Sequence, residues 1–167
     1  IERWDEKVID PACGSGTLLA ASYHRKMELY KEKVGRELSE KEMMELHKKF
    51  LEEDITGIDI MPFAAHLTAL NLSAQQLEAT TNFLRIACMD SLELAPLLKS
   101  KDFAERGIVI KSFSKELQKT LRGLGIIVSR RGATSLSEEK SEFELKPVDV
   151  VIMNPPFSDR EKLPKEY

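Results

Sequence analysis

Residues 7–16, with the sequence KVIDPACGSG, decide the fold. A short apolar run ends in the carboxylate Asp10, and the turn that follows contains Gly14 and Gly16. Further apolar residues come directly after the turn, so the pattern predicts a strand, a glycine turn and a helix that begins near Thr17. The two glycines permit positive φ angles and let the backbone come close to a ligand.

Three more apolar segments of strand length also end in a polar side chain. They are residues 55–60, 84–89 and 148–153, with Asp59, Asp90 and Asn154 at their ends. Strands that alternate with helices predict a parallel, doubly wound α/β sheet of the Rossmann-like type. Because the strands are almost continuously apolar, we expect the sheet to be covered on both faces.

Helical spacing of apolar residues predicts the helices between these strands. The first runs from Thr17 to about Tyr30, and Gly35 is its expected stop. Residues 39–42, SEKE, form a capping box that predicts a second helix, whose acidic end at 52–54 we expect to be solvated. Phe63, Leu67, Leu70 and Ala74 recur at helical spacing and predict a third helix.

Residues 92–146 fit this alternation poorly, so we interpret them as an insertion or variable segment within a single domain that spans 1–167. Within the insertion, residues 114–121 are a candidate helix, and residues 107–110 and 125–129 are candidate strands.

Composition limits the classes of protein to be considered. The 167 residues, 42% hydrophobic and 32% charged, are typical of one globular domain. No apolar run approaches the ~20 residues that a membrane span needs. The net charge of −3 argues against strong binding of duplex DNA by this segment alone. Cys13, Cys88 and the histidines lack metal-ligand spacing, so we expect no metal site, and free thiols in a reducing cytoplasm.

The polar strand ends predict one shared binding site, because ligands of open parallel sheets bind outside the carboxyl ends of the strands. Asp59 could accept hydrogen bonds from ribose hydroxyls, and Asp90 from the exocyclic amine of adenine. The fingerprint of dinucleotide-binding proteins does not fit. Leu19 occupies the position of its third glycine, and the next strand-end acid, Asp59, lies much farther beyond the glycine turn than the ~20 residues of that motif. The pattern favours an adenosine-containing ligand.

Residues 154–157 have the sequence Asn154-Pro155-Pro156-Phe157, which is the most specific chemical signal in the chain. The prolines stiffen the backbone and remove amide donors, so carbonyl acceptors remain. The Asn154 side-chain oxygen and the Pro155 carbonyl could each accept one N–H of an aromatic or amide NH2 group. Both bonds would favour a pyramidal nitrogen and stabilise the positive charge that develops on it. Phe157 offers a flat face on which a base can stack.

These residues resemble a known family. Residues 10–16 together with 154–157 are similar to the amino-methyltransferases of DNA, above all the adenine-N6 enzymes of restriction–modification systems. Residues 57–64, GIDIMPFA, resemble the second conserved segment of that group, and Asp90 matches its adenine-contacting acid. The likeness covers about residues 7–91 and 147–158.

The resemblance implies a cofactor, a substrate and a role for each site residue. The cofactor would be S-adenosylmethionine, and the target adenine in DNA would be flipped out of the helix. The cofactor would be held by Asp10, Ala12, Gly14 and Gly16 around its methionine part, Asp59 on the ribose, Ile60 beside the adenine ring and Asp90 on the adenine amine. Asn154, Pro155, Pro156 and Phe157 would form the catalytic segment that holds the target base.

The resemblance also implies that more protein is needed. The family has a seven-stranded mixed sheet, and this chain would supply its first four parallel strands, with the remaining strands after Tyr167. We expect a segment before Ile1 and a DNA-recognition domain or subunit outside the chain, so the segment alone could be inactive.

Two alternatives stay open at this stage. Similar Asn-Pro-Pro-aromatic segments occur in methyltransferases that act on glutamine side chains of proteins or on guanine amines of RNA. The chain could also be a cofactor-binding scaffold without turnover.

Overall fold

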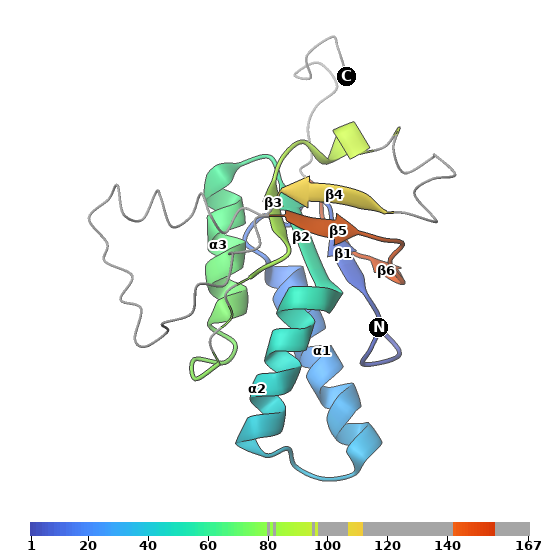
Figure 1. Ribbon diagram of the computed structural model, residues 1–167, viewed down its shortest axis with the longest axis vertical. Coiled ribbons are helices and arrows are strands. Elements are labelled where there is room, and N and C mark those ends of the chain that lie inside the picture. The colour runs from blue at the N-terminus through green and yellow to red at the C-terminus, as the bar shows by residue number, and fades with distance from the viewer. Residues whose placement is uncertain (80, 82, 95, 97–106, 112–141, 156–167) are drawn as a thin grey trace, which may run out of the picture.

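The predicted parallel sheet is present. The computed structural model describes residues 1–79, 81, 83–94, 96, 107–111 and 142–155 (Figure 1). Its main sheet has four parallel strands in the order β3-β2-β1-β6. Their bounds are β1 Val8–Asp10, β2 Ile55–Asp59, β3 Ile86–Cys88 and β6 Val150–Val151. The α/β fold class expected from the sequence is therefore confirmed.

The strand register brings the carboxyl ends to one edge of the sheet. On β1, Val8 pairs with Ile55 of β2 and also with Val150 of β6. The pairing continues to Asp10 opposite Gly57. Since all neighbours run parallel, the residues that follow β1, β2, β3 and β6 leave the sheet in the same direction.

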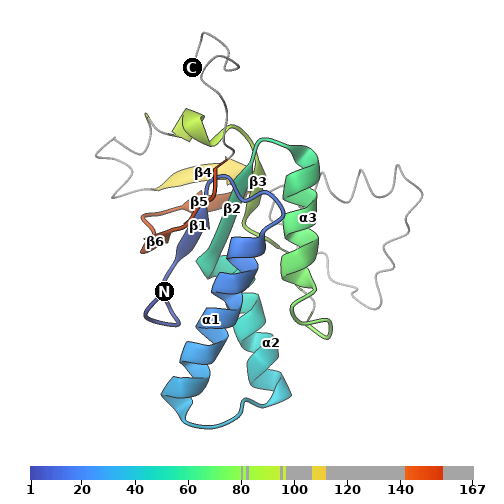
Figure 2. The ribbon, with the colours of Figure 1, turned by 180° about the vertical axis from the view of Figure 1, so that it is seen from behind.

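Three helices contribute to the core on one face of this sheet: the first and third lie against the strands, and the second packs beside the first (Figure 2). They are α1 Thr17–Val34, α2 Glu40–Lys49 and α3 Pro62–Ser73. Gly35 ends α1 with φ 69°, and its amide donates to Lys31. The capping box between Ser39 and Glu42 starts α2 as predicted, with both reciprocal bonds formed. A single π-helical turn, η1 (Phe50–Asp54), then leads into β2.

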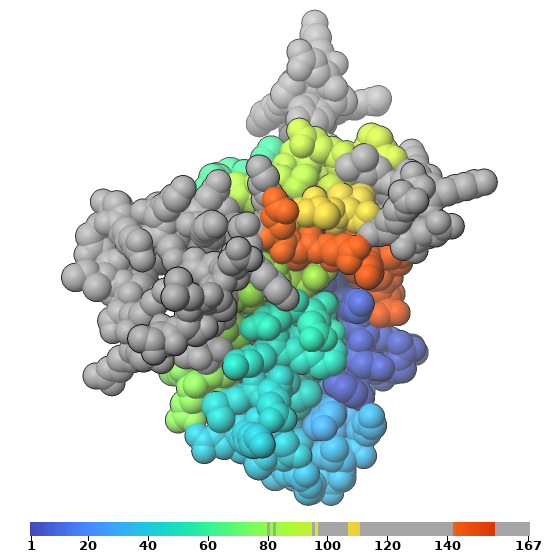
Figure 3. Space-filling view, viewed as in Figure 1, coloured from blue at the N-terminus to red at the C-terminus, as the bar shows by residue number. Residues whose placement is uncertain are grey.

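The opposite face of the sheet is covered by a hairpin from the segment between β3 and β6. Strands β4 (Ile108–Lys111) and β5 (Glu142–Leu145) pair antiparallel. Phe143 of this hairpin meets Phe83 edge to face, and both belong to a second core cluster with Ile9 and Ile58 of the sheet. Figure 3 shows the hairpin in yellow and orange at the surface of the molecule.

Part of the segment 92–146 therefore packs on the sheet and helps to form the core. The predicted strand at 107–110 is confirmed by β4, whereas β5 was not predicted. A short 3-10 turn, η2 (Ser91–Leu94), opens the segment. The candidate elements at 114–121 and 125–129 lie outside the described residues.

The fourth predicted strand is shorter than expected. Residues 148–153 give two strand residues, Val150 and Val151, and the side chain of Val151 is 59% exposed. Within the described sheet, β6 lies at one end and has a single neighbour, β1. An end strand has fewer hydrogen-bonding and packing partners, so an apolar sequence alone does not extend it.

The prediction of a solvated acidic helix end at 52–54 is wrong for Asp54, whereas Glu53 is exposed. Asp54 is 1% exposed and pairs with two lysines. Its carboxylate lies 3.1 Å from the Nζ atom of Lys26, which is fully buried, and 2.7 Å from that of Lys49. Burial lowers the pKa of Lys26 and the charge of Asp54 raises it. A buried carboxylate needs such partners, and sequence patterning does not reveal them.

The helix predicted after the second strand exists, but its apolar stripe does not face the core. Phe63 is 74% exposed and Leu70 is 53% exposed. The packed face carries Ala65, Thr68 and Leu72, all of which are buried. The helix is apolar on both sides, so the spacing of its larger residues could not identify the buried face.

Candidate cofactor and base site

The segments that follow β1 and β6 lie side by side. The amide of Ile152 donates to the carbonyl of Ile9 over 2.9 Å, which continues the parallel pairing beyond Val151. Asn154 comes two residues later and is exposed. Asn154 and the loop after Asp10 therefore leave the same edge of the sheet from neighbouring strands.

The loop between β1 and α1 is a tight turn that requires glycine. Gly14 has φ 54° and Gly16 has φ 78°, which are left-handed conformations that other residues rarely adopt. The turn is closed by a 2.7 Å bond from the Gly16 amide to the Cys13 carbonyl. The Cys13 amide donates to Ile58 of β2 over 2.9 Å, so the loop is tied to the next strand.

The two loop glycines face different surroundings. A Cβ atom on Gly14 would lie within 4 Å of no other atom in the part of the chain that the structure describes. A Cβ atom on Gly16 would lie 2.9 Å from side-chain atoms of Thr68, because α3 approaches the loop closely. Gly16 is therefore required by packing, while the side of Gly14 opens onto free space.

Asp59 connects the second strand to the glycine loop. One carboxylate oxygen accepts from the Gly14 amide over 2.8 Å, and the other accepts from the Met61 amide over 2.8 Å. Each oxygen of an ionised carboxylate can accept more than one hydrogen bond. Asp59 is half-buried, so its remaining acceptor capacity lies at the surface of the sheet edge.

Asp10 ends β1 and directly precedes the glycine loop. It is 1% exposed, and its carboxylate accepts from the Ala12 amide over 3.0 Å. Burial raises the pKa of Asp10, the bond from Ala12 lowers it, and the nearby charge of Asp59 raises it again. The carboxylates of Asp10 and Asp59 are thus close enough to interact electrostatically. The hydrogen bond from the Ala12 amide also lets Asp10 stabilise the start of the loop.

The N-terminus of α1 points backbone donors at this edge. No side chain caps it, and no acidic residue lies in its first turn. The first amides of a helix have no partner within the helix, and the helix dipole favours a negative group at that end. The end of α1 therefore offers hydrogen-bond donors to an anionic part of a ligand.

Apolar side chains adjoin the carboxylates. Ile60 and Met61, which follow β2, are 62% and 59% exposed. Leu92 is 62% exposed, and its amide donates to the Asp90 carboxylate over 2.9 Å. This combination suits a purine: the exposed apolar groups can contact its flat faces, and the acceptors can bind the polar groups at its edge.

The final predicted site segment is described in part. Asn154 and Pro155 are exposed after β6. Pro156 and Phe157 lie outside the described residues. The structure thus brings the predicted residues of β1, β2, β3 and β6 to one edge, as far as that edge is described.

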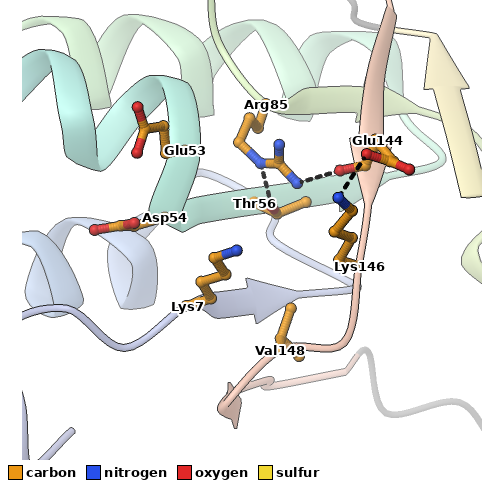
Figure 4. A pocket seen from close by; sticks show the side chains of 8 residues that line it. All are labelled: Lys7, Glu53, Asp54, Thr56, Arg85, Glu144, Lys146 and Val148. Atoms are coloured by element: carbon orange, nitrogen blue, oxygen red, sulfur yellow. Dashed lines mark hydrogen bonds and ion pairs between the residues drawn. The ribbon is translucent and has the colours of Figure 1, made fainter. Parts of the chain in front are cut away.

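The pocket drawn in Figure 4 lies elsewhere, at the amino ends of the strands. It has a volume of about 240 Å³. The Arg85 guanidinium crosses it, donating to the Thr56 hydroxyl over 3.0 Å and to the Glu144 carbonyl over 2.9 Å. Its lining residues are Lys7, Glu53, Asp54, Thr56, Arg85, Glu144, Lys146 and Val148. It joins the sheet to the hairpin and is separate from the strand-end site.

Two residues that hold the site were not singled out from the sequence, and a third, Gly57, belongs to the segment 57–64 but was given no structural role there. Thr68 and Asn71 on α3 donate to carbonyls of the glycine loop, at 2.9 Å to Gly14 and 2.7 Å to Ser15. Gly57 of β2 lets α1 pack closely, because a Cβ atom there would lie 2.8 Å from Leu19. For Thr68 and Asn71, the one signal in the sequence is that they are polar residues within a mainly apolar helix.

Comparison with known proteins identifies the family. A family model of the MmeI DNA-methyltransferase domain matches residues 4–165. The chain belongs to this family. A search of curated proteins finds no matching relative.

Membership in the MmeI DNA-methyltransferase family confirms four expectations from the sequence: the resemblance, the fold class, adenine-specific DNA methylation and a restriction–modification context. It favours DNA over the protein and RNA substrates that the sequence left open. Among the described residues, no helix is long and apolar enough to cross a membrane.

Proposed function

We propose that the carboxyl edge of β1, β2, β3 and β6 binds S-adenosylmethionine and places its methyl group against N6 of an adenine turned out of DNA. The carrying observation is that β1 pairs with both β2 and β6, which puts the glycine loop, Asp59 and Asn154 at one edge. Base extrusion is part of the proposal because N6 is otherwise inaccessible to an enzyme in a duplex.

The chemical groups at this edge fit the cofactor. The open side of Gly14 gives a ligand access to the backbone, and a larger residue would fill that space. The uncapped end of α1 suits the carboxylate of the methionine part. Asp59 has acceptor capacity for ribose hydroxyls, and exposed Ile60 offers an apolar face to the adenine ring. Asp90 follows β3 and would accept from the adenine amine.

The chain's own residues would prepare the target nitrogen. When bound, the cofactor supplies a methyl group that its sulfonium already activates. The Asn154 side chain and the Pro155 carbonyl would each accept one N–H bond of the adenine amine. These bonds favour a pyramidal nitrogen, and they strengthen as positive charge develops on it. Pro156 stiffens the segment, and Phe157 would stack on the extruded base.

A substitution at Asn154 tests this division of labour in the full-length enzyme. Asn154→Ala removes an acceptor for the target amine and leaves the glycine loop and Asp59 intact. We expect kcat for tritiated-methyl transfer to DNA to fall at least 100-fold, with an unchanged dissociation constant for S-adenosylmethionine. Asp59→Ala is the matched variant, and it should mainly weaken cofactor binding. Equal loss of turnover and cofactor affinity in Asn154→Ala would contradict the proposed role.

A further inference from the structure

Helix α3 holds the glycine loop through two side chains that the proposed chemistry does not use. Thr68 is fully buried, and its hydroxyl donates to the Gly14 carbonyl over 2.9 Å. One helical turn further, the side-chain amide of Asn71 donates to the Ser15 carbonyl over 2.7 Å. Two successive carbonyls of the loop are therefore turned toward α3.

This arrangement fixes the direction of the loop amides. No described peptide bond is cis, and the C=O and N–H groups of a trans peptide point in opposite directions. Because Thr68 draws the Gly14 carbonyl toward α3, the Ser15 N–H must point away from α3. In the same way, Asn71 orients the next peptide, whose Gly16 N–H closes the turn on the Cys13 carbonyl.

The Ser15 amide is available to a ligand. It makes no hydrogen bond to any other residue that the structure describes. It adjoins the open side of Gly14 and the uncapped end of α1. Because Ser15 is partly exposed beside this open space, its amide can donate to an acceptor that a ligand places there.

We infer that Thr68 and Asn71 are positioning residues that aim the Ser15 amide at the carboxylate of the bound cofactor. The inference rests on the proposed function, because it needs S-adenosylmethionine at this edge. By holding the Gly14 and Ser15 carbonyls on the α3 side, the two residues also keep these partial negative charges away from an anionic ligand. Their effect is on cofactor affinity, while the target amine is held by other residues.

Four variants of the full-length enzyme test the inference. Thr68→Val keeps the shape and removes the hydroxyl, whereas Thr68→Ser keeps the hydroxyl. Asn71→Ala removes the second donor. Gln75→Ala is the matched control, because Gln75, which lies just after the end of α3, also donates to a backbone carbonyl, that of Asn71, over 2.8 Å and outside the glycine loop.

The readouts are the dissociation constant for S-adenosylmethionine by calorimetry, the melting temperature without ligand, and kcat at saturating cofactor. We expect Thr68→Val and Asn71→Ala to weaken binding about 5- to 10-fold with kcat largely kept. Thr68→Ser and Gln75→Ala should bind like the unaltered enzyme. If Thr68→Val does not fold, Asn71→Ala decides.

The outcomes separate this inference from the proposed function. Unchanged affinity in both Thr68→Val and Asn71→Ala, beside normal binding by the unaltered enzyme, would overturn the inference alone. Weakened binding in Gln75→Ala to the same extent would also overturn it, since a general loosening of α3 would then explain the effect. No binding by the unaltered full-length enzyme would overturn the proposed function itself.

Discussion

Replacing Gly14 by alanine separates the cost of backbone strain from the cost of filling the ligand space. Gly14 has φ 54° and open space where a Cβ atom would lie. Gly35, at the far end of α1, has φ 69° and equally open space. Alanine in this conformation costs about 1–2 kcal/mol, and the reduced entropy of the unfolded chain offsets about 0.4–1 kcal/mol of it. Both variants should therefore lose about 1 kcal/mol of stability.

Their effects on cofactor binding should differ sharply. The methyl group of Gly14→Ala would occupy the space through which a ligand reaches the loop, whereas that of Gly35→Ala lies at the opposite end of the helix. We expect similar melting temperatures for the two full-length variants, about 2–4 °C below the unaltered protein. Calorimetry with S-adenosylmethionine should show a loss of at least tenfold in affinity for Gly14→Ala alone. Equal affinities in the two variants would refute the placement of the cofactor against Gly14.

Three further predictions concern the core that supports the site. Gly57→Ala should lower the free energy of unfolding by about 1–3 kcal/mol in urea titrations, because its Cβ atom would lie 2.8 Å from Leu19 and 2.9 Å from Ile86; an unchanged midpoint would count against close packing of α1 on β2. Asp54→Asn should cost about 3–5 kcal/mol, since it leaves the fully buried Lys26 without its carboxylate, and adding Lys26→Met should recover much of the loss; no recovery would argue against an unpaired charge as the cause. Stability should fall as the pH drops below about 6.5, because burial lowers the pKa of His47 in the folded state from 6.5, and the unfolded chain then binds the proton more readily. His47→Gln should flatten this pH dependence in thermal denaturation, and an identical slope would assign it to other groups.

The parallel sheet and its polar edge could be predicted because they depend on local signals. The run at 7–16 combines an apolar strand, a carboxylate and two glycines, and each feature has a direct structural meaning. The capping box at Ser39 was equally reliable, since its reciprocal bonds involve residues three apart in the chain.

Features that depend on distant partners could not be predicted in this way. The burial of Asp54 depends on Lys26, which lies on another helix. Strand β5 is recognised by its pairing with β4 and by the contact of Phe143 with Phe83. The buried face of α3 was hidden because large apolar residues lie on both sides of the helix, with Phe63 and Leu70 exposed and Leu72 buried.

The candidate site shows the same division. The strand-end residues Asp10, Asp59 and Asn154 were found from the sequence, because position at a strand end is a local property. Thr68 and Asn71 were not, because their importance lies in contacts with the glycine loop more than 50 residues away in sequence. Residues that touch the ligand are thus easier to predict than residues that hold the loop in place.

Photo-crosslinking of radiolabelled S-adenosylmethionine to the full-length enzyme, followed by peptide mapping, tests the central claim most directly. The proposed site predicts label in peptides that contain residues 10–16 or 59–63, and prior addition of unlabelled cofactor should abolish it. Gly35→Ala should be labelled normally and Gly14→Ala weakly. Sequencing of the labelled peptides must place the label at the residue level, and label on Lys7 or Arg85, which line the pocket at the amino edge, would contradict a cofactor site at the carboxyl ends of the strands.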